Sequence, residues 1–84
     1  MLNAHSEPDP GIANRIGMLS PREREVLGMT SQGLTNREVA AQLHVSVHAV
    51  KFHLASSFRK LGVTNRTEAA VAFLRSQAGF ADQR

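Results

Sequence analysis

The chain has 84 residues, of which 42% are hydrophobic and 20% charged, so it can bury one small core and is not compositionally disordered. The absence of cysteine excludes disulfides, a thiol nucleophile and cysteine-based zinc or iron–sulfur sites. The formal net charge of +3 is modest, and its distribution along the chain says more than its sum.

The N-terminal residues and the apolar runs predict no membrane segment. Residues 1–7 have neither the basic start nor the apolar stretch of a secretory signal. The longest apolar run, residues 69–74, is too short to cross a bilayer. We therefore expect a cytoplasmic protein without a membrane partner.

The first 17 residues are expected to form a flexible tail or linker. Pro8, Pro10, Gly11 and Gly17 interrupt any helix there, and apolar residues are sparse. The sequence thus predicts a tail over residues 1–17 and a folded domain over residues 18–84.

Capping motifs mark the starts of helices after this tail. Segments that begin at Ser20, Thr35 and Asn65 each place a glutamate three residues after a capping side chain, and Ser46 can cap one more helix. No segment alternates between polar and apolar residues with period two, so an all-α fold is expected. The four predicted helices span residues 20–32, 35–43, 46–61 and 65–78.

The second and third predicted helices form a helix-turn-helix. Only His44 and Val45 separate the end of one from the cap of the next, which makes a tight turn between a short helix and a longer one. Gly33 and Gly62 follow predicted helix ends, where glycine is common.

Basic residues dominate the middle of the chain. No acidic residue occurs between Val39 and Thr67. The cations and histidines of that stretch are Lys51, Arg59, Lys60, Arg66, His44, His48 and His53. A basic segment in an otherwise balanced domain is typical of a polyanion partner, and the alternative is a solvated basic face without a partner.

The predicted helix over residues 46–61 has a core side and an outer side. Val50, Leu54, Ser57 and Leu61 share one stripe, which predicts the core side. The outer side contains His48, Phe52, Ala55 and Arg59, flanked by Lys51 and Ser56. Such a surface suits a DNA major groove, where cations reach guanine edges and apolar groups meet thymine methyls. A solvent-facing Phe52 indicates a covering partner, unless its ring folds over a neighbouring helix.

The last predicted helix has more apolar surface than one core contact requires. Ala69 and Phe73 form one stripe, and Val71, Leu74 and Ala78 form another on roughly the opposite side. The second stripe is expected to pair two copies of the domain, unless both stripes are buried within one domain or against a missing neighbour.

Together these motifs resemble the LuxR-type (NarL/FixJ-type) helix-turn-helix domain. The resemblance extends over about residues 19–80. The matching segments are residues 19–27, 33–40, 43–46, 50–54, 58–63 and 65–69. It implies a small four-helix domain with a tri-helical core, a helix-turn-helix and a C-terminal helix that often pairs two copies on DNA.

The resemblance also implies contacts with DNA. Base contacts are expected from Lys51 and Phe52, with His48 and Ala55 as further candidates on the same side of the helix. Backbone contacts are expected where a helix N-terminus or a basic or hydroxyl side chain can hold phosphate. The candidates are Thr35, Asn36, Arg37, Ser46, His53, Arg59 and Lys60.

The chain departs from the family pattern at three positions. Ala49 replaces a usual threonine, and Ala55 stands where many relatives carry a basic or polar residue. Ser57 replaces a usual isoleucine in the core stripe. A buried serine must find an acceptor, and the carbonyl of His53 is the expected one.

The function expected from this resemblance is sequence-specific recognition of double-stranded DNA by a transcription regulator. It would act as a homodimer on DNA, with RNA polymerase as a further candidate partner and without cofactor, metal or small-molecule ligand. Region 4 of a sigma factor and a protein-interaction domain that keeps the helix-turn-helix shape are the alternatives. An enzyme is not expected, since His44, His48 and His53 do not converge on a metal and no serine lies in a glycine-rich elbow. The operator, the direction of regulation and any accompanying domain are not specified by these residues.

Overall fold

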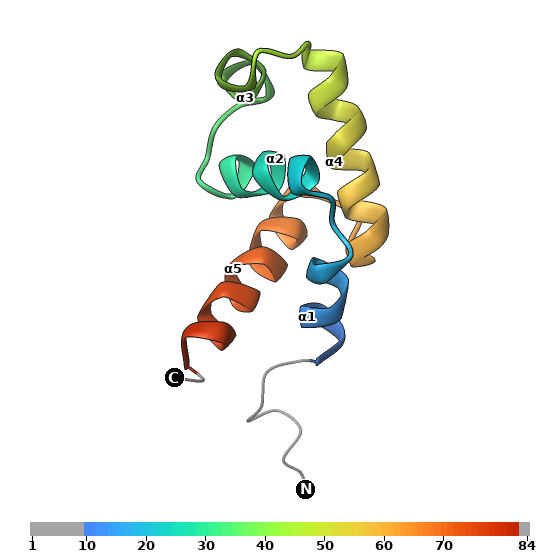
Figure 1. Cartoon of the computed structure of the whole chain (residues 1–84), viewed down its shortest axis with the longest axis vertical. Helices are drawn as coiled ribbons and strands as arrows, with labels where there is room; N and C mark the ends of the chain where they lie inside the picture. Colours follow the sequence, from blue (N-terminus) through green and yellow to red (C-terminus); the bar gives the residue numbers. More distant parts are fainter. Residues whose placement is uncertain (1–9, 83–84) are drawn as a thin grey trace, which may run out of the picture.

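Five helices make up the structure, a computed structural model that describes residues 10–82. They are α1 (Pro10–Gly17), α2 (Pro21–Ser31), α3 (Asn36–Leu43), α4 (Val47–Leu61) and α5 (Arg66–Asp82). In Figure 1, α3 and the first half of α4 lie at one end of the molecule, α1 and α5 extend toward the other, and α2 lies between them. No strand occurs within these residues, which confirms the predicted all-α class. None of the helices in this range is long and apolar enough to cross a membrane.

Reciprocal capping starts both α2 and α3, as predicted. The Ser20 hydroxyl accepts from the N–H of Glu23 at 3.1 Å, and the Glu23 carboxylate accepts from the N–H of Ser20 at 2.8 Å. Thr35 and Glu38 make the same two bonds, at 3.1 and 2.8 Å. Each box satisfies backbone N–H groups that a helix start otherwise leaves without partners.

The capping motif at the start of α5 forms a different set of hydrogen bonds. The side-chain oxygen of Asn65 caps the N–H of Glu68 at 2.9 Å, as predicted. The Glu68 carboxylate, however, accepts from the N–H of Thr64 at 2.9 Å and from its hydroxyl at 3.0 Å. These bonds from Thr64 lower the pKa of Glu68. The cap is therefore extended by one residue toward the N-terminus.

Helix α1 occupies residues 10–17, where the sequence predicts an irregular tail. Pro10 is the first helical residue, at which the missing N–H costs nothing, and Gly17 is the last. Ile16 is buried beside Leu19 and Leu61. The expected interruption of helical structure is therefore wrong for residues 10–17, because proline is tolerated in the first turn of a helix and glycine at its end. The role of residues 1–17 as a tail or linker stays a prediction. Residues 1–9 lie outside the described range, and the division at residue 17 stays a prediction.

The core consists of two clusters that meet at α2. Leu27 belongs to the cluster shared with α1, α4 and α5, whereas its neighbour Val26 belongs to the cluster shared with α3 and α4. Both side chains are fully buried. Phe58 of α4 packs against both clusters. Helix α2 thus connects the two ends of the domain.

A left-handed residue ends each of the two helices of the helix-turn-helix. His44 caps α3 with φ 59°, and its N–H donates to the carbonyl of Ala40. Gly62 caps α4 with φ 72°, where the absence of Cβ removes the usual penalty. The tight reversal at His44 brings Ser46 into position as the cap of α4.

Ser57 lies on the core side of α4, at a position where the family resemblance predicts an aliphatic residue. Its side chain is fully buried, and the hydroxyl donates to the carbonyl of His53 at 2.8 Å. The predicted acceptor is confirmed. This bond satisfies the hydroxyl within its own helix, so the buried serine needs no partner from another element.

Candidate nucleic-acid interface

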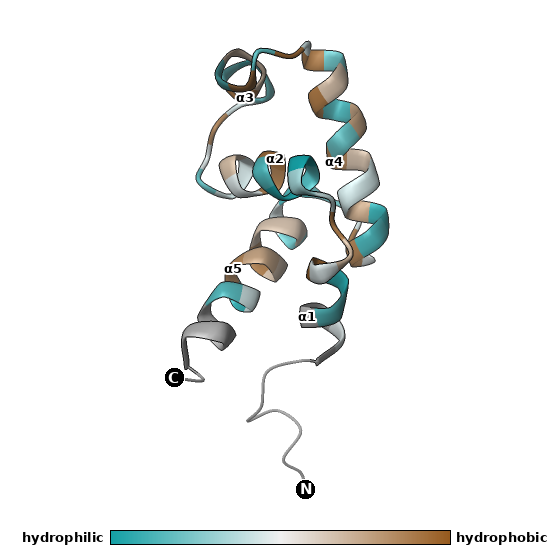
Figure 2. Cartoon of the chain, viewed as in Figure 1, coloured by the Kyte–Doolittle hydropathy of each residue, from teal (hydrophilic) through white to brown (hydrophobic). Residues whose placement is uncertain are grey.

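Helix α4 presents a continuous outer side to solvent. Its predicted members His48, Lys51, Phe52, Ala55 and Arg59 are all exposed. Phe52 leaves 65% of its surface exposed, so its ring does not fold over a neighbouring helix. Figure 2 shows hydrophilic and hydrophobic residues interleaved along α4, as expected for a helix with one buried side.

The orientation of this outer side follows from the buried side. Val50 and Leu54 pack with Val26 of α2 and Val39 of α3 in one core cluster. Rotating α4 about its axis would expose these apolar groups to water, at a cost of about 25 cal/mol for each Å² of apolar surface exposed. The direction in which Lys51 points is therefore a consequence of core packing.

Two aromatic rings meet at the middle of α4. The rings of Phe52 and His53 lie edge to face, with centroids 5.7 Å apart and an interplanar angle of 72°. His53, a predicted backbone contact, is half-buried. Its ring supports the ring of Phe52 from the side, which limits the orientations that the exposed aromatic can adopt.

The start of α3 contains the predicted backbone contacts Thr35, Asn36 and Arg37. Thr35 and Arg37 are exposed, and Asn36 is half-buried. The amide oxygen of Asn36 accepts from the Arg66 guanidinium at 3.3 Å, and Arg66 also donates to the carbonyl of Leu34. Part of the hydrogen-bonding capacity of Asn36 is thus used inside the protein, to join the starts of α3 and α5.

The hydroxyls of Thr35 and Ser46 serve as helix caps. Ser46 accepts from the N–H of Ala49 at 3.0 Å, and Thr35 accepts from the N–H of Glu38. Both residues are exposed. A hydroxyl that accepts from the backbone N–H that it caps still has one proton to donate, so each can also bind an anion at the helix start.

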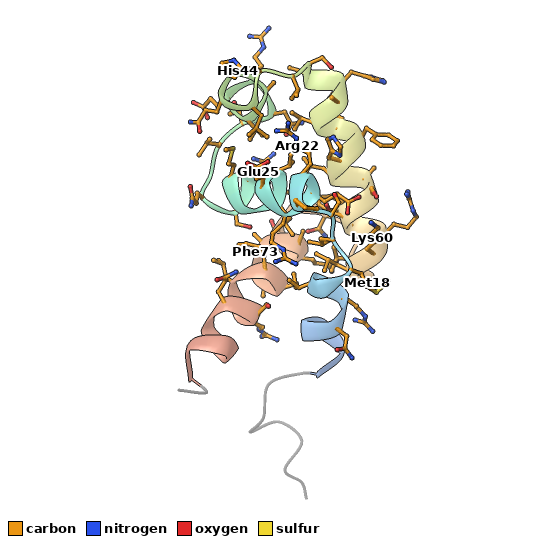
Figure 3. The ribbon with its side chains drawn as sticks, in the orientation of Figure 1. Met18, Arg22, Glu25, His44, Lys60 and Phe73 are labelled. Carbon is orange, nitrogen blue, oxygen red and sulfur yellow. The ribbon has the colours of Figure 1, made fainter. Side chains whose placement is uncertain are left out.

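Lys60, a predicted phosphate contact, is bound within the protein. Its ammonium donates to the Glu23 carboxylate at 2.8 Å and to the carbonyl of Met18 at 3.3 Å. In Figure 3, Lys60 and Met18 lie beside each other where α4 meets the connection between α1 and α2. The Lys60 side chain is 34% exposed and that of Glu23 is 7% exposed. Contact between Lys60 and phosphate stays a prediction.

Glu23 is the buried centre of a polar cluster that also includes Ser20, Ser56 and Lys60. One carboxylate oxygen accepts from the N–H of Ser20 and from Lys60, and the other accepts from the Ser56 hydroxyl at 2.5 Å. Burial acts to raise the pKa of Glu23, but hydrogen bonds from Lys60, Ser56 and Ser20 and the charge of Lys60 outweigh it and lower the pKa to about 2. Glu23 is therefore ionised at neutral pH.

The sequence interpretation did not identify Glu23 and Ser56 as partners. Glu23 was assigned only to a capping box, which it does form. Ser56 was assigned to the edge of the outer side, but it is buried against Glu23. The available signal was a small polar residue four positions before a lysine on the same side of α4.

Helix α5 has one buried and one exposed apolar stripe. Ala69 is fully buried, and Phe73 packs against the core cluster that contains Leu27. Val71 and Leu74, two of the three predicted dimer contacts, are exposed, Leu74 to 53%. The side chain of Ala78, the third, lies outside the described residues. The exposed stripe is thus available for a partner.

No group of three potential metal ligands comes together within residues 10–82. The candidate surfaces within this range are the exposed face of α4, the capped start of α3 and the apolar stripe on α5.

Comparisons with known proteins identify the family. Transcriptional activator protein BjaR1 of Bradyrhizobium diazoefficiens is 42% identical over 69 residues, which cover 82% of this chain and 27% of the relative. Response regulator Rre1 of Synechocystis is 49% identical over 64 residues, 76% of this chain and 26% of the relative. The nitrate/nitrite response regulator protein NarP of Escherichia coli is 36% identical over 72 residues, which cover 86% of this chain and 31% of the relative.

The chain therefore spans about a quarter to a third of the length of these relatives. No solved structure is significantly similar to it. The family model described as bacterial regulatory proteins, luxR family, matches residues 17–73, which include the end of α1, all of α2 to α4 and the first half of α5. The chain belongs to the luxR family of bacterial regulatory proteins.

Proposed function

We propose that the chain is the DNA-binding part of a transcription regulator. Helix α4 enters the major groove, the start of α3 lies over the phosphate backbone, and two copies pair through α5. Lys51 and Phe52 contact bases, with His48 and Ala55 beside them. The named relatives that are transcriptional activators and response regulators support this assignment.

One observation supports the proposal more than any other. The outer side of α4 combines an exposed phenylalanine with cations and no carboxylate, although the chain has seven acidic residues. An exposed apolar ring is costly in water, and the absence of acids removes repulsion from phosphate. A nucleic-acid groove would remove the ring from water and place phosphates near the cations.

Selection of bound sequences from random duplexes tests the proposal directly. A DNA-binding regulator enriches a short motif, repeated with a spacing of about one helical turn if two copies bind together. Its affinity falls steeply as salt is added, because neutralised phosphates release counterions. No enrichment together with salt-independent binding to a protein partner would favour the interaction-domain alternative.

The variant Lys51→Ala should weaken binding to the selected motif by about 1–3 kcal/mol and reduce discrimination at one base position. The reason is that a lysine on the outer side of α4 can reach guanine acceptors directly. Binding titrations with the motif and its single-base variants measure the effect. Arg75→Ala removes the same charge from an exposed position on α5 and should preserve the preference. An unchanged preference in Lys51→Ala would contradict this placement of α4.

The variant Leu74→Glu should abolish paired binding while the single domain still folds. A carboxylate in the centre of the exposed α5 stripe cannot be buried against a second copy without a large desolvation cost. Gel-shift stoichiometry on a duplex with two half-sites provides the measurement. Gln77→Glu introduces the same charge at another exposed position of α5 and should leave the two-copy complex intact. A two-copy complex formed by Leu74→Glu would show that another surface pairs the domains.

A further inference from the structure

Glu23 and Lys60 form an ion pair beside the outer side of α4. Lys60 follows Arg59 directly and lies one turn after Ser56, whose hydroxyl binds the same carboxylate. It therefore flanks the side that carries Phe52 and Arg59 without belonging to it. A phosphate beside the groove would approach α4 along this flank.

The ammonium of Lys60 is already engaged before any ligand arrives. Two of its three N–H donors have partners, the carboxylate of Glu23 at 2.8 Å and the carbonyl of Met18 at 3.3 Å. The side chain nevertheless stays 34% exposed, so the ammonium is within reach of solvent. A ligand would have to compete with a carboxylate that is itself fixed by Ser20 and Ser56.

The pair presents no net charge to a polyanion. A phosphate contact strengthens binding and its salt dependence only when a cation is neutralised and counterions are released. Because Glu23 is ionised and contacts the ammonium of Lys60, the positive charge of Lys60 is balanced within the protein. Arg59 and Lys51, for which the structure shows no acidic partner among residues 10–82, differ from Lys60 in this respect.

We propose that Glu23 limits the affinity of the domain for DNA by holding the ammonium of Lys60 away from phosphate. This role rests on the proposed function and concerns affinity for any duplex, not the choice of sequence. Glu23 acts as a positioning residue, because it affects DNA only through Lys60.

The variant Glu23→Gln isolates this role. Glutamine has nearly the same shape, and its amide oxygen can still complete the capping box at Ser20, while its NH2 group can donate to the Ser56 hydroxyl. The variant thus removes the charge that retains Lys60 and keeps a hydrogen bond to Ser20 and to Ser56. Glu25→Gln is the matched control, since it removes the same charge from the same helix, where Glu25 forms an exposed pair with Arg22. Exposed pairs of this kind contribute little.

The measurement is binding of the full chain to a random-sequence duplex as a function of salt. The log–log slope for Glu23→Gln should be steeper than that of the unaltered chain by about 0.9, as for one additional phosphate contact. Its affinity relative to the unaltered chain should therefore rise about 3.5-fold as the salt falls from roughly 200 to 50 mM. Glu25→Gln should change the slope much less, and the double variant Glu23→Gln, Lys60→Gln should return it to the original value.

The outcomes separate this proposal from the proposed function. Salt-dependent binding by the unaltered chain with the same slope in Glu23→Gln would overturn the role of Glu23. So would weaker binding by Glu23→Gln at unchanged slope, which would mean that the ion pair orients Lys60 toward phosphate. A steeper slope that persists in the double variant would also overturn it. No binding to any duplex by the folded, unaltered chain would overturn the proposed function itself.

Discussion

Replacing Lys60 with methionine should lower the free energy of unfolding by about 2–3 kcal/mol. Methionine keeps the aliphatic stem but leaves the Glu23 carboxylate, which is 7% exposed, without its cation. An unpaired buried charge costs about 3–5 kcal/mol when burial is complete, and the partial exposure of Lys60 lowers that value. Urea denaturation at neutral pH measures the difference. Arg59→Met removes the neighbouring exposed cation and should change stability by less than about 0.5 kcal/mol.

The pH dependence of this loss identifies its cause. In the unaltered chain the pKa of Glu23 is lowered from 4.5 to about 2, so its stabilising contribution is present above about pH 4.5 and is lost as the pH falls toward 2. In Lys60→Met, protonation of Glu23 removes the uncompensated charge. The difference between the two proteins should therefore shrink as the pH falls below about 4.5. A difference that is independent of pH would assign the loss to packing instead.

Replacing Ile16 with alanine should destabilise the domain by about 2–3 kcal/mol. Ile16 is the residue through which α1 enters the core cluster with Leu19, Leu27 and Leu61. Truncating a buried aliphatic side chain removes its transfer free energy and leaves a cavity. Thermal or urea unfolding followed by circular dichroism measures the effect.

The control for this variant lies two residues away. Met18 is exposed, and Met18→Ala should leave stability within about 0.5 kcal/mol of the unaltered chain. Equal and negligible effects of Ile16→Ala and Met18→Ala would mean that α1 does not contribute to the stability of the domain. In its contribution to the free energy of unfolding, α1 would then behave like the tail predicted over residues 1–17.

Local patterns predicted most of the fold because local bonds form it. The boxes at Ser20 and Thr35 and the cap at Ser46 lie within one turn of the backbone groups that they satisfy, so the sequence marks these helix starts directly. Helix α1 was missed for the opposite reason. Its stabilising contacts, from Ile16 to Leu61 and Ala69, join residues far apart in the chain and have no local signature.

The candidate interface likewise has features that local sequence patterns predict and features that they do not. The helical period of α4 separates exposed Lys51 and Phe52 from buried Val50 and Leu54, so their placement could be predicted from the sequence. The pairing of Glu23 with Lys60 spans 37 residues and depends on how α2 crosses α4. A glutamate in a capping box gives no indication that its second oxygen is buried against another helix.

The adjacent side chains of Val26 and Leu27 make α2, like α4, part of both apolar clusters. Because they belong to different apolar clusters, loosening α2 removes a partner from both ends of the domain at once. The end that contains α3 and the first half of α4 and the end that contains α1 and α5 are therefore expected to melt as a single cooperative unit. A ligand that binds the outer side of α4 would in turn slow amide hydrogen exchange in α1 and α5, at the other end of the molecule.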